Sequence, residues 1–200
     1  MPALWVKVCG LTSPDAVAAA VAAGVDAVGF VFAESKRKVT AQRAAELARA
    51  VPKHIVRVAV MLHPSQQQLD EVWSVCHPDV LQTDIDDLPA LQVPKGLQVT
   101  PVLRAGRELP NPLPARLLFE GPVSGTGETT DWTAAAKLAS RTQLILAGGL
   151  TPANVAAAIT VARPFGVDVS SGVEVQPGVK DPAKIHEFVR NARAAGNGVQ

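Results

Sequence analysis

Eight short apolar runs recur along this 200-residue chain, and most of them are followed by a helical stretch. The runs are rich in β-branched residues and do not alternate between polar and apolar positions. Such runs are typical of parallel strands that are covered on both faces. The predicted strands are Trp5–Cys9, Ala27–Phe32, Val56–Met61, Val80–Gln82, Gln98–Leu103, Arg116–Glu120, Gln143–Ala147 and Gly166–Val169.

Helix-start signals separate these strands. Ser13, Thr40 and Ser65 are capping residues ahead of helical stretches. The pairs Thr151-Pro152 and Asp181-Pro182 predict helix starts in which proline occupies a position that needs no N–H donor. Residues 86–92 leave room only for a short helix, and three prolines in residues 105–115 argue against a regular helix after the fifth strand.

The alternation of strands and helices predicts an α/β fold, a compact (β/α)8 TIM barrel with a short or missing helix after strands 4 and 5. Residues 1–200 are expected to form this barrel as a single domain, since no break in composition divides the chain. A doubly wound open sheet is the structural alternative. It is less well supported, because no G-x-G-x-x-G motif follows the first strand.

Composition narrows the class of protein. A net charge of +1 gives no electrostatic reason to expect a nucleic acid or an anionic membrane as partner. No apolar stretch approaches the roughly 20 residues that span a bilayer, and the N-terminus does not resemble a signal peptide. Cys9 and Cys76 form neither a disulfide framework nor a C-x-x-C metal site, so we expect a cytoplasmic enzyme without a bound metal. The oligomeric state is left open.

Glycine-rich turns follow the last two predicted strands. Gly148 and Gly149 come after the seventh strand, and Ser170, Ser171 and Gly172 come after the eighth. In TIM barrels these two loops frequently bind a phosphate through backbone N–H groups and a short helix N-terminus. Glycine permits a close approach of the backbone, and serine adds hydroxyl donors. The sequence therefore predicts a phosphate site at this end of the barrel.

Four titratable residues lie at the carboxyl ends of predicted strands, where barrel enzymes carry their chemistry: Cys9, Asp84, Glu120 and Asp168. A thiol has an ordinary pKa of about 8.5, so a reactive Cys9 needs a nearby cation or helix N-terminus. Lys7 lies on the same side of its strand as Cys9. The alternative for Cys9 is a small buried apolar residue. Glu120 ends an apolar strand, where a carboxyl with a raised pKa suits a general acid.

Several motifs, in order and across most of the chain, resemble those of phosphoribosylanthranilate isomerases. The matching segments are Val6–Gly10, Asp26–Phe32 with Ser35–Arg37, Ser124–Gly127 with Asp131-Trp132, Leu146–Leu150 with Pro152 and Asn154-Val155, and Gly166–Glu174 with Pro177-Gly178 and Lys180-Asp181.

The resemblance implies an activity and residue roles. Enzymes of this family convert N-(5-phosphoribosyl)anthranilate to 1-(2-carboxyphenylamino)-1-deoxyribulose 5-phosphate in tryptophan biosynthesis, through an Amadori rearrangement that needs no cofactor. By likeness to the family, Cys9 is the general base, Arg37 helps to hold the anthranilate end and Asp168 lies near the sugar hydroxyls. Gln82 also matches the family pattern, as a substrate-binding residue.

Two segments depart from the family pattern. The sixth strand usually ends in aspartate, whereas Glu120 stands here, and its extra methylene moves the carboxyl about 1.5 Å outward. The fourth strand usually ends in Gln-Leu-His-Gly, but here the residues are Gln82-Thr83-Asp84-Ile85. We expect Glu120 to act as the general acid, either alone or with Asp131 or Asp168. The alternatives are another phosphate-binding barrel enzyme, such as a thiamine-phosphate-synthase-like or epimerase-like protein, and a barrel that binds a sugar phosphate without turnover.

Overall fold

Eight parallel strands close into a barrel, and their order around it is their order in the chain. The structure is a computed structural model that describes residues 4–122 and 129–198. The motif Ser124–Gly127 lies outside these ranges. The barrel strands are β1 (Trp5–Cys9), β2 (Ala27–Val31), β3 (Val56–Val60), β4 (Val80–Asp84), β5 (Gln98–Arg104), β6 (Arg116–Glu120), β7 (Gln143–Leu146) and β8 (Gly166–Val169).

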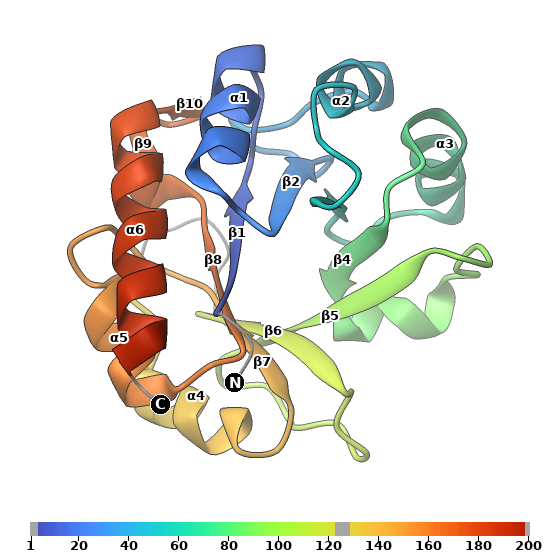
Figure 1. Ribbon diagram of the computed structural model, residues 1–200. Coiled ribbons are helices and arrows are strands. Elements are labelled where there is room, and N and C mark those ends of the chain that lie inside the picture. The colour runs from blue at the N-terminus through green and yellow to red at the C-terminus, as the bar shows by residue number, and fades with distance from the viewer. Residues whose placement is uncertain (1–3, 123–128, 199–200) are drawn as a thin grey trace.

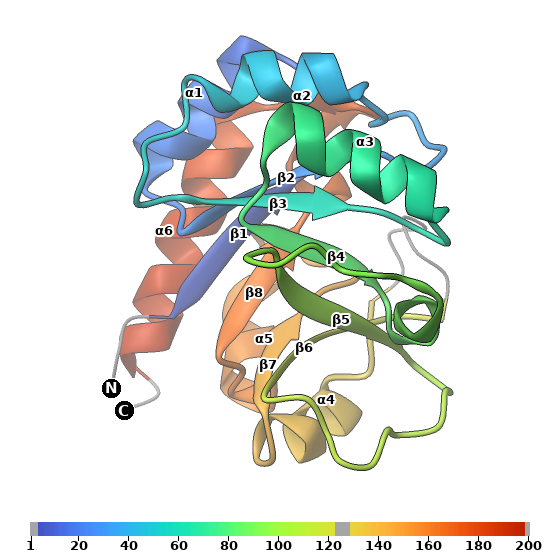
Figure 2. The ribbon, with the colours of Figure 1, turned by 90° about the vertical axis from the view of Figure 1, so that its right-hand side faces the viewer.

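Helices surround the barrel, as Figures 1 and 2 show. They are α1 (Pro14–Ala23), α2 (Ala41–Ala48), α3 (Gln66–Cys76), α4 (Trp132–Ala139), α5 (Val155–Ala162) and α6 (Pro182–Gly198), with 3-10 turns η1 (Ile85–Ala90) and η2 (Ser171–Val173). As predicted, only η1 follows β4, and no helix is assigned between β5 and β6. A hairpin of β9 (Glu174–Gln176) and β10 (Val179–Lys180), which the sequence analysis did not identify, precedes α6.

Most of the predicted helix starts are confirmed. The side chains of Ser13, Thr40 and Ser65 each accept a hydrogen bond from a backbone N–H in the first turn of their helix. The prediction for Thr151-Pro152 is wrong by three residues, since α5 begins at Val155. Residues 151–154 instead form a turn closed by a hydrogen bond from the Thr151 N–H to the Asn154 side chain at 2.8 Å.

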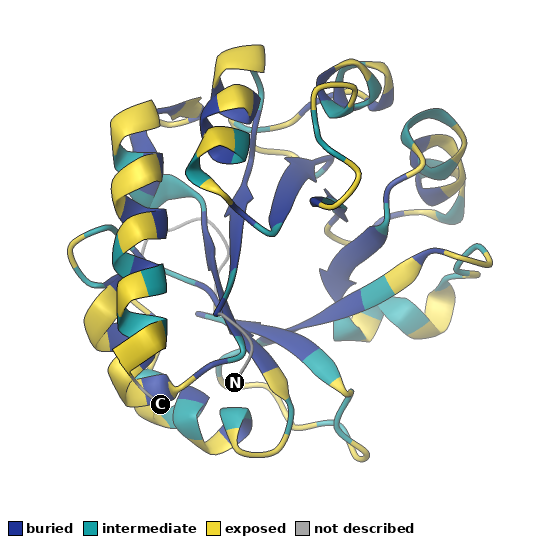
Figure 3. Cartoon of the chain, in the orientation of Figure 1, coloured by how far each residue is buried: buried dark blue, intermediate teal, exposed yellow. Residues whose placement is uncertain are grey.

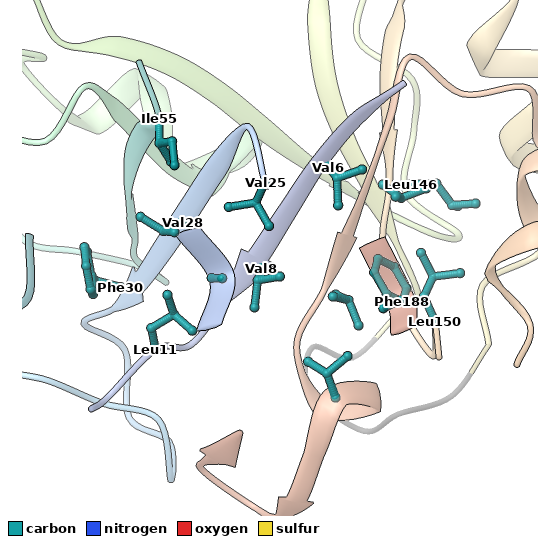
Figure 4. Close-up of a cluster of buried hydrophobic side chains, with 14 of the residues drawn as sticks. Val6, Val8, Leu11, Val25, Val28, Phe30, Ile55, Leu146, Leu150 and Phe188 are labelled. Carbon is teal, nitrogen blue, oxygen red and sulfur yellow. The ribbon is translucent and has the colours of Figure 1, made fainter. Parts of the chain in front are cut away.

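Alternate residues of each strand point to opposite sides of the barrel wall. One side packs against the surrounding helices, and the other side faces the inside of the barrel. Val6, Val8 and Val28 face outward and join the main hydrophobic cluster with residues of the helices, including Phe188 of α6 (Figure 4). Figure 3 shows the strands mostly buried and the outer faces of the helices exposed. The inward positions include the buried polar residues Lys7 and Gln82, so the inside of the barrel holds groups that can bind a ligand.

Candidate active site

One cavity opens at the carboxyl ends of the strands and brings together nearly all of the predicted site residues. It is lined by Cys9, Arg37, Gln82, Glu120, Asp168, Gly148, Gly149, Ser170 and Ser171. Gly172 packs against Leu150, which also lines the cavity. A Cβ placed on Gly172 would lie 1.9 Å from the Leu150 carbonyl oxygen. The close approach of these two segments therefore requires glycine at this position.

A buried ion pair between Lys7 and Asp168 reaches the cavity through Asp168, which lines it. Lys7 and Asp168 are direct neighbours in the register of β1 and β8. The Lys7 ammonium donates to Asp168 Oδ2 at 2.7 Å and to Gln82 Oε1 at 2.9 Å, and its residue is 1% exposed. Burial would lower the pKa of Lys7, but the charges of Asp168 and Cys9 outweigh burial and raise it. Asp168 Oδ1 is buried without a hydrogen-bond partner, so one acceptor remains for a ligand.

Cys9 lies beside Lys7 because β2 carries a glycine opposite it. Gly29 is the register partner of Cys9, and a Cβ on Gly29 would lie 2.9 Å from Cys9 Sγ and 3.0 Å from Lys7 Cε. Burial raises the pKa of the thiol, and the ammonium of Lys7 opposes part of that rise. Among the neighbouring groups, Lys7 makes the largest contribution that favours ionisation of the thiol.

A second network fixes the loop that carries Arg37. Arg37 donates from Nε and Nη2 to the two carboxylate oxygens of Glu174, at 2.7 and 2.9 Å. Lys180 donates to Glu174 Oε1 at 2.8 Å and to the Ser170 carbonyl oxygen at 2.9 Å. Ser170 Oγ in turn donates to the Cys9 carbonyl oxygen at 3.1 Å. Glu174 and Lys180 therefore connect the Arg37 side of the cavity to the predicted phosphate loop.

Acid should weaken the fold through Glu174. Burial would raise the pKa of this carboxyl, but hydrogen bonds and charges from Arg37 and Lys180 outweigh burial and lower it. The contribution of Glu174 to the free energy of unfolding should therefore be fully present above the pKa of the unfolded state, about 4.3. This contribution should be lost as the pH falls through the lower pKa of the folded state. Glu174→Gln should flatten this dependence in urea titrations at neutral and acidic pH. An unchanged dependence in the variant contradicts this assignment.

Glu120 does not have the apolar surroundings that the sequence suggested. Arg104, at the end of β5, is its register partner and donates to Glu120 Oε1 at 2.9 Å. The same guanidinium binds both oxygens of Asp84, at 2.8 and 2.7 Å. All three residues line the cavity. Asp131, a suggested substitute acid, caps α4 by accepting from the N–H groups of Thr133 and Ala134.

Sequence reasoning missed two cations of this site. Arg104 was placed outside its strand, because the predicted strand ended at Leu103, one residue short. Its position at a strand end between two acidic strand ends was the available signal. Lys180 was noted only within the Lys180-Asp181 motif and was given no role, because its contact with Glu174 depends on the hairpin that carries it.

No group of three or more His, Cys, Asp or Glu side chains in residues 4–122 and 129–198 is arranged to hold a metal ion. In the same ranges, no helix has the length and apolar character needed to cross a membrane.

Comparisons with known proteins agree on one family. The model of the family described as N-(5'phosphoribosyl)anthranilate (PRA) isomerase matches residues 6–191. A relative of that name from Pseudomonas fluorescens is 40% identical over 210 residues, which cover 96% of this chain and 97% of the relative. One from Streptococcus pneumoniae is 37% identical over 202 residues and covers 98% of each chain.

Solved structures support the same assignment. TrpF from Jonesia denitrificans superposes with a TM-score of 0.82 at 38% identity, covering 99% of this chain and all of its own (100%). A phosphoribosyl anthranilate isomerase in complex with reduced 1-(o-carboxyphenylamino)-1-deoxyribulose 5-phosphate gives a TM-score of 0.79 at 30% identity, with 96% of this chain and 99% of that one covered. The chain belongs to the phosphoribosylanthranilate isomerase family.

Proposed function

We propose that this chain, acting as one barrel over residues 1–200, isomerises N-(5-phosphoribosyl)anthranilate to 1-(2-carboxyphenylamino)-1-deoxyribulose 5-phosphate in cytoplasmic tryptophan biosynthesis. Cys9 serves as general base and Glu120 as general acid, without a cofactor. The observation that carries the proposal is that both groups line one cavity, from β1 and β6, together with the glycine-rich loops.

The first step opens the sugar ring. Glu120 gives its proton to the furanose ring oxygen as the bond between that oxygen and C1 breaks. The lone pair of the anthranilate nitrogen forms the C=N bond of an iminium ion. A carboxyl positioned against the leaving oxygen accelerates such a step by about 10²- to 10⁴-fold.

The second step removes the C2 proton. The Cys9 thiolate takes this proton, and the C–H electrons form the enolamine while the iminium nitrogen becomes neutral. The enolamine then tautomerises to the ketone product. Lys7 favours the thiolate because its ammonium lies beside Cys9 within the barrel.

Binding groups surround these two residues. Asp168 Oδ1, buried without a partner, suits a sugar hydroxyl. Gln82 accepts from Lys7 through Oε1, which leaves its amide nitrogen as the donor. Glu174 fixes the plane of the Arg37 guanidinium, whose face suits the anthranilate ring. The backbone N–H groups around Gly148, Gly149, Ser170, Ser171 and Gly172 are assigned to the phosphate.

Genetic rescue tests the proposed activity. The gene should restore growth of an isomerase-deficient tryptophan auxotroph on medium without tryptophan, and the purified protein should convert the substrate to the named product. Expressed, folded protein that binds the reduced product analogue but gives neither growth nor turnover would contradict the proposal. That result would favour a barrel that only binds a sugar phosphate.

A further inference from the structure

Three charged side chains meet at the cavity, and each comes from a different strand. Asp84 ends β4, Arg104 ends β5 and Glu120 ends β6, and these strands are neighbours in the barrel. The side chains are only 12–14% exposed. Coulombic interactions between them are therefore weakly screened by solvent.

The two carboxylates share the guanidinium unequally. Asp84 accepts two hydrogen bonds, from Nε and Nη2 of Arg104, whereas Glu120 accepts one from Nη1. Two carboxylates and one guanidinium sum to a charge of −1, so a single proton neutralises the group. Placing that proton on Asp84 breaks the bidentate pair, whereas placing it on Glu120 leaves that pair intact. Glu120 is therefore the member of the trio that is best able to hold a proton.

We propose that Arg104, anchored by Asp84, is a positioning residue that holds Glu120 at the cavity and stabilises the carboxylate left after Glu120 gives its proton to the substrate. This inference rests on the proposed function. When the proton leaves, negative charge appears on Glu120 against a guanidinium that is already in place. The interaction strengthens during the reaction, which lowers the barrier more than it tightens substrate binding.

Burial would lower the pKa of Arg104, but the hydrogen bond to Asp84 and the charges of Glu120, Asp84 and Asp87 outweigh burial and raise it. Asp87 is also paired with His63 at 2.7 Å, further from the cavity.

A double-mutant cycle between Arg104 and Glu120 tests the proposal. Arg104→Met should lower kcat by ~10- to 100-fold and change KM little. In a Glu120→Gln background the same substitution should change kcat by less than about twofold, because the group through which Arg104 acts is gone. Arg104→Lys should recover part of kcat, since it returns the charge without the fork geometry.

The pH dependence of kcat/KM separates this role from a purely structural one, because a residue that only stabilises the fold would not change it. Activity needs protonated Glu120 together with the Cys9 thiolate, and a carboxyl ionises at lower pH than a thiol, so the low-pH rising limb of kcat/KM ends at the pKa of Glu120. Asp84→Asn leaves the whole charge of Arg104 acting on Glu120. The low-pH rising limb of the profile should therefore move to lower pH in Asp84→Asn, and the plateau of kcat/KM above it should fall.

The barrel provides a matched control at its other end. Arg57 binds both oxygens of Asp79, at 2.9 and 2.8 Å, in the same bidentate geometry. Arg57→Met should leave kcat and the pH profile unchanged. If Arg104→Met does not fold, the cycle is run with Arg104→Lys.

Two results would overturn the inference. An equal loss of kcat on Arg104→Met in both backgrounds means that Arg104 does not act through Glu120. Unchanged kcat in Arg104→Met, with Glu120→Gln impaired, means that Glu120 needs no partner here. A Glu120→Gln variant with wild-type turnover instead overturns the proposed acid itself, and the positioning role falls with it.

Discussion

Cys9→Ala should lower kcat by about 10²- to 10⁴-fold, the range that a positioned general base contributes. The substitution removes the only side-chain atom able to take the C2 proton from this position on β1, while Lys7 and the phosphate loop stay in place. KM should therefore change little. Steady-state kinetics with purified protein measure both constants, and circular dichroism checks that the variant is folded.

Two further variants sharpen the Cys9 test. Cys9→Ser keeps the shape but replaces the thiol by a hydroxyl, which is a far weaker acid, so it should be nearly as impaired as Cys9→Ala. Cys76→Ser is the control, because Cys76 ends α3 and donates to the Ala41 carbonyl oxygen at 3.4 Å, away from the cavity. A Cys9→Ala variant with wild-type kcat would mean that another group removes the proton.

The pH dependence of the wild type follows from the state of Cys9. Burial raises the pKa of the thiol, with a further rise from Asp168, and Lys7 and Lys180 offset only part of this. Turnover needs the Cys9 thiolate and protonated Glu120 at once, so the upper-pH limb of kcat/KM reports the thiol and should lie above the ordinary thiol pKa of about 8.5.

Lys7→Met should have the second largest effect, and it should act on both stability and activity. The substitution leaves the Asp168 carboxylate buried without its cation, which typically destabilises a protein by about 3–5 kcal/mol. It also removes the charge that favours the Cys9 thiolate, so the upper-pH limb of kcat/KM should move to higher pH. Urea unfolding and the pH profile measure the two effects separately.

A double variant separates charge from packing at this pair. Lys7→Met with Asp168→Asn removes both charges, so much of the lost stability should return, while activity should not. Full activity in Lys7→Met would show that Cys9 ionises without the ammonium. Unchanged stability would show that Asp168 is already neutral in the folded protein.

The barrel was predictable because its signals are local. Apolar runs and capping residues such as Ser13 and Thr40 depend on neighbours within a few positions, so the sequence carries them directly. The site residues at strand ends followed from the fold, since parallel strands of a barrel all present their carboxyl ends to one face. The prediction that Cys9 and Glu120 lie at the same end of the barrel is confirmed, since both line one cavity.

Partnerships across strands were not predictable in the same way. They depend on register, which a single sequence does not determine for parallel strands. The Lys7–Asp168 pair and the contact of Arg104 with Glu120 both arise from such registers. The two departures from the family pattern, at Asp84 and Glu120, looked independent in the sequence. In the structure Arg104 joins them.

The most direct test of the central claim is a crystal structure of this protein with reduced 1-(o-carboxyphenylamino)-1-deoxyribulose 5-phosphate. We expect the phosphate on the loops of Gly148, Gly149 and Ser170–Gly172. Cys9 Sγ should lie about 3–3.5 Å from C2, and a Glu120 carboxylate oxygen should lie about 2.6–3.2 Å from the hydroxyl that derives from the ring oxygen. An analogue bound with C2 away from Cys9, or with Glu120 out of reach of that hydroxyl, would contradict the acid–base pair.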